Sequence, residues 1–283
     1  MPQWQGSPSS RAMRIAEGAE LIREDLPSSA RIDVEVPLEA GDALGTPIAR
    51  LSGVLRARDA ARAALGPLRE RASVPIIVGG DGAISLAGLE SAVSTHGGIA
   101  VLWFDAHPAL QEPTTSPSGA ASHMTLRHAL GDGAPDLASP HPVAAEWVTL
   151  VGTRASDPDE ALEITRLELT VVQGAVTSED DADGEALAEA IRARLDGVGG
   201  VYIHVSLTVL DPAEFSSVHA PEPFGLTAKQ LAAAIRAAVT AVPLVGATVC
   251  EFAPADAAQA ADDLPTVLRI LGALTSGLAE RQA

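Results

Sequence analysis

An aspartate and a histidine, Asp105 and His107, follow directly after the apolar run VLWF. Residues two apart on an extended strand point the same way, so this carboxylate and imidazole could share a metal ion or a proton. The pair is also consistent with a structural role, in which the two side chains hydrogen-bond to each other and hold the following loop. The residue types alone leave both interpretations open.

Two further apolar runs end in polar side chains. In the segment VYIHVSLTVLDP, His204, Ser206 and Thr208 alternate with apolar residues and therefore line one face of an extended strand. Glu251 ends the run LVGATVC, where a carboxylate is poorly solvated and needs a cation or hydrogen-bond donors. Ligands of parallel sheets bind at the carboxyl ends of strands, which makes these residues site candidates.

A glycine-rich turn, GGDG at 79–82, follows the apolar run VPIIV. Such a turn could cradle a phosphate at a helix N-terminus. It lacks the dinucleotide-binding spacing and the P-loop lysine, so a tight strand-to-helix turn is the preferred interpretation.

Short apolar runs that are rich in β-branched residues alternate with longer segments of helical period. This alternation predicts βαβ crossovers and a mainly parallel sheet. We expect one α/β domain over residues 1–283, with three layers in the order α/β/α. The predicted strands are 32–36, 75–78, 99–104, 147–151, 169–172, 201–205 and 244–251.

Three helices are indicated by an apolar face. One contains Leu51 to Leu68, a second carries Leu187, Ile191 and Leu195 and ends at 196–197, and the last is expected to follow Pro265. The acidic stretch 179–185 is interpreted as a solvated loop that leads into a helix. The Pro-, Ser- and Thr-rich segment 109–122 is too long for a simple turn and follows a strand, so it is expected at the site.

Composition excludes several classes of function. The formal net charge of −18 argues against nucleic-acid binding, which needs clustered Lys and Arg. Cys250 is the only cysteine, so neither an intrachain disulfide nor a cysteine-based zinc site is expected, and a buried inert thiol is the preferred interpretation. The start has no apolar signal region, and the most apolar long window contains Arg236 and Pro243. We therefore expect a cytoplasmic protein with no membrane span.

Taken in order, these motifs resemble those of the ureohydrolase family, which contains the arginases and agmatinases. That family shows a GGDH turn, a D-A-H-x-D strand end, a Ser-Gly loop leading to His-Gly, an S-x-D-x-D-x-x-D-P strand, a P-E-P-G-G-L-T stretch and a V-E-x-N-P strand. The matching pieces are GGDG at 79–82, DAHPA at 105–109, SPSGAASHM at 116–124, VYIHVSLTVLDP at 201–212, APEPFGLT at 220–227 and VCEFAP at 249–254. The likeness extends to the opening PQWQG and to GTRASDPDE at 152–160, so it covers nearly the whole chain.

The resemblance implies an arginase-like fold and a pair of manganese ions, bridged by a hydroxide that attacks a guanidinium or amidine carbon. The family binds these ions through two histidines and four aspartates. Asp105 and His107 match two of these six ligands. The other four positions are occupied here by Gly82, Ala109, Ser206 and Thr208.

The resemblance also assigns other site residues. The acid/base histidine of the family falls on Ser122 without a gap, and His123 is its neighbour, so His123 takes the role only with a shift of one residue. Ser118 and Asp157 match positions that contact the amino-acid end of the substrate in arginases, and Gln111 replaces an Asn on the same loop. Glu251 matches the carboxylate that faces the guanidinium.

The leading hypothesis is a homologue that has lost the binuclear manganese site and metal-dependent guanidine hydrolysis, and that acts as a non-catalytic binding or assembly protein. No cofactor is then expected. Converging carboxylates repel one another without cations, so loss of the metals favours replacement of the remaining aspartates. By resemblance, the expected partners are a guanidino small molecule and further copies, as a trimer or hexamer, or an active relative.

Two alternatives remain. In the first, the protein is an active hydrolase of a guanidino or amidine compound, with manganese in a remodelled site that uses Asp105, His107, His123 and Glu251; His204 lies on the same strand face as Ser206. In the second, the same cleft carries a metal-free chemistry, for which the sequence indicates no nucleophile paired with a base.

Overall fold

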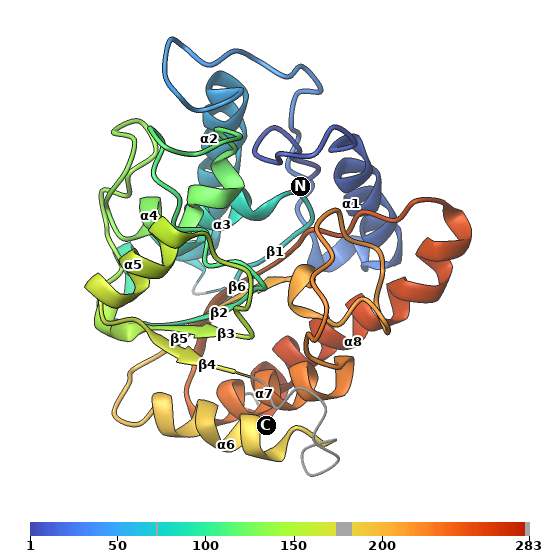
Figure 1. The fold of residues 1–283 in the computed structure, drawn as a ribbon. Helices are drawn as coiled ribbons and strands as arrows, with labels where there is room; N and C mark the ends of the chain where they lie inside the picture. Colours follow the sequence, from blue (N-terminus) through green and yellow to red (C-terminus); the bar gives the residue numbers. More distant parts are fainter. Residues whose placement is uncertain (72, 174–182, 281–283) are drawn as a thin grey trace.

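The computed structural model describes residues 1–71, 73–173 and 183–280, and a single sheet of six parallel strands lies at its centre (Figure 1). The strand order is β1-β6-β5-β2-β3-β4. The sheet confirms six predicted strands, with ends that shift by a residue or two. They are β1 (Ile76–Val78), β2 (Ala100–Phe104), β3 (Val148–Val151), β4 (Thr170–Val172), β5 (Val201–Ser206) and β6 (Leu244–Cys250).

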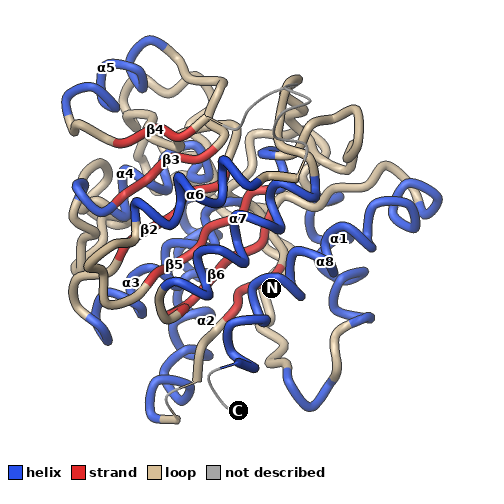
Figure 2. The backbone as a smooth tube through the Cα atoms, turned by 90° about the horizontal axis from the view of Figure 1, so that it is seen from below, coloured by secondary structure: helices blue, strands red, loops and turns tan. Residues whose placement is uncertain are grey.

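Helices cover both faces of this sheet, and the expected three-layer α/β/α architecture is confirmed (Figures 1 and 2). The layer with α6 (Glu185–Arg194), α7 (Ala228–Ala241) and α8 (Ala257–Glu280) packs on one face, where Leu102, Phe104, Ile203 and Val205 meet it. On the other face, Val101, Trp103 and Tyr202 pack in a second cluster with residues of α2 (Leu51–Glu70), α3 (Ser85–His96) and α4 (Thr125–Ala129). The remaining helices are α1 (Met13–Asp25) and α5 (Pro158–Arg166).

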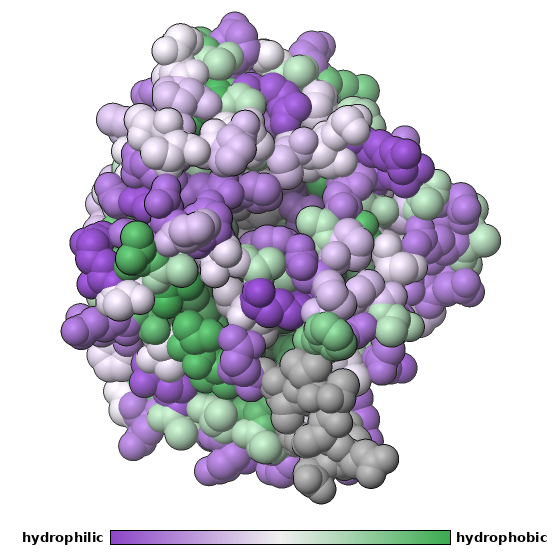
Figure 3. All heavy atoms as spheres, viewed as in Figure 1, coloured by the Kyte–Doolittle hydropathy of each residue, from purple (hydrophilic) through white to green (hydrophobic). Residues whose placement is uncertain are grey.

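The four inner strands are buried along their whole length, whereas the edge strands β1 and β4 are partly exposed. This explains why the inner strands read as nearly continuous apolar runs. On the face in Figure 3, apolar side chains gather beside the sheet edge that ends in β4. Leu162 of α5 and Val171 of β4 are among the exposed large apolar residues.

Two predicted elements are wrong. The segment 32–36 is not a strand, because a strand requires a hydrogen-bonded neighbour and the described residues supply none. The last helix begins at Ala257, before Pro265, so this proline lies inside the helix and removes only one hydrogen-bond donor there.

The remaining local predictions hold where they can be compared. Leu187, Ile191 and Leu195 are buried, and the chain turns at Gly197 with φ of +75° just after α6. Most of the acidic stretch 179–185 lies outside the described residues, and α6 starts at its last residue, Glu185.

Cys250 is buried and free, as expected. Among the described residues, no helix combines the length and the apolar character needed to cross a membrane.

Candidate active site

A small cavity opens where β2, β5 and β6 end, at the carboxyl edge of the sheet, and has a water-accessible volume of about 40 Å³. Parallel strands bring the residues that follow them to the same edge, which is why motifs far apart in the sequence meet here. The cavity is lined by Ser7, Pro8, Gly82, Asp105, His107, Ala109, Ser122, His123, Ser206, Thr208, His219, Ala220 and Glu251. The six positions that the resemblance assigns to metal ligands therefore border one cavity.

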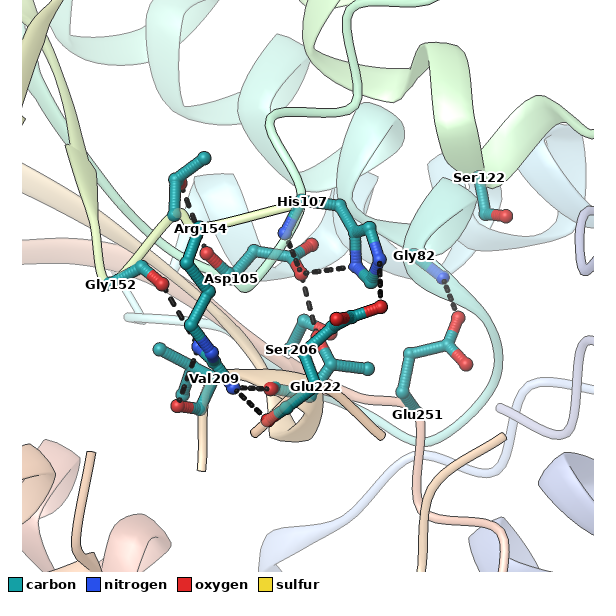
Figure 4. A network of polar contacts seen from close by, with 12 residues as sticks. Gly82, Asp105, His107, Ser122, Gly152, Arg154, Ser206, Val209, Glu222 and Glu251 are labelled. Carbon is teal, nitrogen blue, oxygen red and sulfur yellow. Dashed lines mark hydrogen bonds and ion pairs between the residues drawn. The ribbon is translucent and has the colours of Figure 1, made fainter. Parts of the chain in front are cut away.

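The carboxylate of Asp105 is the centre of a hydrogen-bond network (Figure 4). Its Oδ1 accepts from the Thr208 hydroxyl at 2.7 Å and from the His107 backbone N–H at 3.0 Å. The His107 imidazole Nδ1 lies 3.6 Å from Oδ1, and Nε2 of the buried His204 lies 3.6 Å from Oδ2. Burial raises the pKa of Asp105, but the neighbouring imidazoles of His107 and His204 outweigh this effect and hold the pKa well below its usual range.

Ser206 and Thr208 form a chain of hydroxyls that ends on this carboxylate. Their oxygens lie 2.7 Å apart, and both residues are buried. Thr208 donates to Asp105, so its oxygen is free to accept from Ser206. The chain fills, with two neutral groups, the space next to Asp105 that two carboxylates have in the family motif.

His107 lies between two acids, Asp105 and Glu222. Besides Asp105, its Nε2 faces Oε1 of Glu222 at 3.7 Å (Figure 4). Burial lowers the pKa of His107, but Asp105 and then Glu222 raise it further, so the net pKa lies above 6.5. The ring of His123 stacks at 6.2 Å from His107, and burial together with that neighbour lowers the pKa of His123.

Glu251 lies on the opposite side of the cavity and has few partners. Its Oε1 accepts from the Gly82 backbone N–H at 3.0 Å. Burial and the nearby charge of Asp81 raise the pKa of Glu251 to about 8, so the side chain is mostly protonated at neutral pH. Its backbone has a φ of +71°, a conformation that costs energy for a residue with a Cβ atom.

The glycine-rich turn next to Glu251 is structural. Gly79 and Gly80 have φ of +87° and +85°, and the Asp81 carboxylate accepts from the backbone N–H of Ala83 at 2.9 Å. Gly6 of the opening segment also donates to Asp81, at 2.8 Å. These bonds confirm the preferred interpretation of a tight strand-to-helix turn. Burial nevertheless raises the pKa of Asp81 to about 6.

Three polar atoms at or near the cavity are buried and have no hydrogen-bond partner within the described part of the chain. They are Ser122 Oγ, His204 Nε2 and His219 Nε2. Ser122 and His219 line the cavity itself, and the sequence analysis did not single out His219. Buried polar groups of this kind are costly unless water or a ligand satisfies them. The cavity therefore has the polarity and the volume for a few ordered waters.

The two predicted substrate-contact residues lie outside the cavity lining. Ser118 is exposed on the loop 109–122, and its hydroxyl accepts from the Ala120 backbone. Asp157 begins α5 in a capping box with Glu160, and Gln111 donates to it at 3.3 Å. Gln111 also accepts from Ser116 at 2.7 Å and so ties the loop to α5. These contacts do not bring Ser118 and Asp157 to the cavity.

Arg154 and Glu222 were missed by the sequence analysis, although both lie within motifs that it quoted. The Arg154 guanidinium donates to backbone carbonyls of Gly152, Thr208 and Glu222, among others, at 2.8 to 3.0 Å (Figure 4). It thereby fixes the segment after β5 against the loop that carries Glu222. The sequence did contain a signal for this role of Arg154: an arginine that follows the end of a predicted strand and precedes a proline-containing loop.

Among the described residues, no group of three or more His, Cys, Asp or Glu side chains is arranged to hold a metal ion. Asp105 and His107 remain as the two donors at the ligand positions. The backbone, by contrast, leaves space for a side chain at position 82, because a Cβ atom added to Gly82 would lie 3.6 Å from its nearest neighbour, Ser122 Cβ. Ala109 has a φ of +54°, which Asp or Asn adopts at lower cost than Ala.

The comparisons with known proteins agree with this geometry. The model of the Arginase family matches residues 10–268. An arginase of Bacillus caldovelox is 27% identical over 259 residues, covering 88% of this chain and 84% of that protein. An arginase of Entamoeba histolytica is 30% identical over 159 residues, about half of each chain. The crystal structure of an arginase from Bacillus subtilis superposes with a TM-score of 0.81 at 23% identity, covering 98% of this chain and 96% of that one, which shows the shared fold.

Proposed function

Since this chain belongs to the arginase family, we propose that it is a member whose cavity no longer binds a pair of manganese ions and no longer hydrolyses guanidines by a metal-dependent route. One contact carries the proposal. Thr208 occupies a ligand position of the family, and its hydroxyl donates to Asp105, the only carboxylate left at those positions. A lone pair that would bind a cation is thus engaged by a proton donor.

The residues present do not fit the two ions. Hard divalent cations of this type require several carboxylate and imidazole ligands, and the four replaced positions offer none at Gly82 and Ala109 and only neutral hydroxyls at Ser206 and Thr208.

The backbone supports descent from a metal-binding site. Ala109 keeps a left-handed conformation that is more natural to Asp, and Gly82 keeps ordinary space for a side chain. Replacement of side chains without collapse of the backbone is expected when the scaffold is retained for another reason. We propose that this reason is assembly, with further copies of the chain or with an active relative.

The size of the cavity favours assembly over enclosure of a guanidino ligand. A volume of about 40 Å³ accommodates a few waters, whereas small-molecule sites usually have several hundred Å³. Light scattering of the purified protein measures the proposed trimer or hexamer directly. A monomer at micromolar concentration that also fails to bind an active arginase would remove this part of the proposal.

A second candidate function rests on one observation. His107, His123 and His219 line the same cavity as Glu251, so a single metal ion could recruit three imidazoles after side-chain rearrangement. Such a site would make the protein a hydrolase of a guanidino or amidine compound. Release of urea or ammonia from arginine, agmatine or guanidino acids, lost on His107→Ala, would favour this candidate.

The decisive experiment measures metal content. Elemental analysis of protein purified with supplemental manganese should find far less than one ion per chain. The fourfold variant Gly82→His, Ala109→Asp, Ser206→Asp, Thr208→Asp should recover about two. Its control carries Gly82→Gln, Ala109→Asn, Ser206→Asn and Thr208→Asn, which match the size but not the charge. Stoichiometric manganese in the unaltered protein contradicts the proposal.

A further inference from the structure

The outer edge of the sheet at β4 is exposed and uncharged. The strand consists of Thr170, Val171 and Val172, without the charges, prolines or bulges that protect many sheet edges from pairing. Val171 is 39% exposed, and Leu162 of α5 is 69% exposed. Both views of the fold place α5 beside β4 at this margin of the molecule (Figures 1 and 2). A strand edge and a helix thus form one surface, where apolar side chains gather in Figure 3.

The backbone of Val171 presents hydrogen-bonding groups on the outer side of β4. Val172 accepts from the Gly152 N–H at 3.0 Å, so the residue that follows Val171 bonds to the β3 side. Successive residues of a parallel strand bond to opposite sides, and Val171 therefore points its N–H and C=O away from β3. Neither group has a hydrogen-bond partner within the described residues. An added strand can bond to both.

The exposed side of α5 carries an acid, an apolar residue and a base in that order. Asp159, Leu162 and Arg166 are all exposed, and their spacings of three and four residues place them on one face of the helix. Asp159 has no ion pair among the described residues, whereas Arg166 pairs with Glu163 of its own helix at 2.6 Å. A second α5 that runs antiparallel across Leu162 therefore brings Asp159 of each copy opposite Arg166 of the other.

We propose that two copies of the chain associate through this surface about a two-fold axis, with β4 antiparallel to β4 and α5 antiparallel to α5. The inference rests on the assembly proposed above and identifies its surface. In a two-fold interface the same residues of both copies must complement one another. The two Val171 residues do so by exchanging N–H···O=C bonds, and the two Leu162 side chains do so by apolar contact.

Charge favours a second copy at this surface over most others. With a net charge of −18, two copies repel each other wherever acidic faces meet. On α5, by contrast, each copy supplies both an acid and a base, and antiparallel pairing matches them twice across the axis. Association here thus joins opposite charges on both sides of an apolar centre.

Val171 tests the strand pairing. Light scattering of the unaltered protein should show dimers, or larger even-numbered assemblies, that dissociate on dilution. Val171→Pro removes the outward N–H of both copies and should weaken association about 25-fold, because both bonds are lost and each contributes about fivefold. Val171→Ile keeps the donor and a similar side chain, so this matched control should associate normally. Far-UV spectra and melting temperatures show whether the variants keep the fold.

A charge exchange tests the pairing of the helices. Asp159→Arg and Arg166→Asp each place like charges opposite one another, and each should weaken self-association about fivefold or more. An equimolar mixture of the two variants should associate again, because both contacts of the mixed pair join opposite charges. The control is Arg192→Asp, an exposed position on α6 with the same change of charge. Mixing it with Asp159→Arg should restore nothing.

The possible failures separate this surface from assembly in general. A protein that is monomeric at every concentration and ignores active relatives contradicts both proposals. Assembly that is unchanged in Val171→Pro and in both charge variants refutes this surface alone, as do trimers without hexamers, because a two-fold axis generates even numbers of copies. Hydrogen exchange should protect the Val171 amide increasingly as protein concentration rises. Protection that is independent of concentration means that the chain's own residues cover the edge, and it overturns the proposal.

Discussion

Asp105 and Glu251 border the same cavity at the ends of parallel strands, but their surroundings differ. Asp105 has a hydroxyl, a backbone N–H and two imidazoles within 3.6 Å, and the pKa of this carboxyl is lowered. Glu251 has one backbone donor and an acidic neighbour, Asp81, and its pKa is raised to about 8. One acid is stabilised as an anion, and the other is kept largely neutral.

The difference shows two ways in which a buried carboxyl is accommodated. Around Asp105, Ser206 and Thr208 supply hydroxyls that bond to each other and to the carboxylate. Around Glu251, burial and the acidic neighbour Asp81 raise the pKa, so the carboxyl takes a proton instead. A buried acid is thus stabilised either by donors around its charge or by a change in protonation.

The largest effect is expected from Asp105→Asn. The variant loses the charge that two histidines and Thr208 stabilise, and we expect a loss of about 2–3 kcal/mol in the free energy of unfolding at pH 7. Because the pKa of Asp105 is lower in the folded state, this contribution is present above the unfolded-state pKa and disappears as pH falls through the folded one. Urea unfolding at pH 7 and pH 3 measures both.

The control for that variant is Asp159→Asn, an exposed position on α5. It should change the free energy of unfolding by less than about 0.5 kcal/mol. Comparable stability of Asp105→Asn and Asp159→Asn would mean that the network around Asp105 carries little energy, and the comparison with Glu251 would lose its basis.

Glu251→Gln should increase the free energy of unfolding, whereas Asp105→Asn lowers it. A raised folded-state pKa means that stability is greatest below the unfolded-state value and falls as pH rises through about 8. The amide keeps an acceptor for the Gly82 N–H but cannot ionise. We therefore expect a gain of about 1–3 kcal/mol in the free energy of unfolding at pH 8.5, and a smaller gain at pH 5.

Thermal unfolding from pH 5 to pH 9 tests this variant. The unaltered protein should lose stability over that range more steeply than Glu251→Gln does. Parallel pH profiles for the two proteins would show that Glu251 ionises normally, in which case both carboxylates border the cavity as anions.

Thr208→Val should cost about 1 kcal/mol, because it removes one hydrogen bond to a charged group and leaves the Ser206 hydroxyl without its acceptor. Thr208→Ser keeps the donor and is the matched control, with a cost of less than half of that. If serine and valine cost the same, the methyl group and not the hydroxyl stabilises this position, and the hydroxyl chain has no energetic role.

The sequence predicts the sheet well because inner strands buried on two faces leave a strong apolar signal. It fails at 32–36, where alternation indicates a strand but pairing depends on a neighbour that sequence pattern cannot supply. It fails at Pro265 for a similar reason: packing of α8 on the sheet overrides the local helix-breaking tendency.

The candidate site shows the same division. Asp105, His107 and Glu251 follow strands, so the rule of carboxyl ends brings them together. His219 lines the cavity and Glu222 contacts His107 from a loop whose path depends on bonds from Arg154 to backbone carbonyls. Contacts of this kind join residues far apart in the sequence without any periodic pattern, and residue spacing does not predict them.

The smallest effect concerns the histidines that separate the two acids. His107 faces Asp105 and Glu222 and should titrate above 6.5, whereas His123, which is buried beside His107, should titrate below it. The raised pKa of His107 gives stability that is complete below the unfolded-state pKa and is lost as pH rises through the folded one, worth less than about 1 kcal/mol.

Titration of the imidazole C–H signals by NMR measures each histidine separately. Asp105→Asn should bring the pKa of His107 down, while that of His219, whose charged neighbours are Arg14 and Arg11, stays unchanged and serves as the internal control. If the pKa of His107 is the same in Asp105→Asn as in the unaltered protein, Glu222 and not Asp105 raises it. The contrast between Asp105 and Glu251 would then lose the support of this histidine.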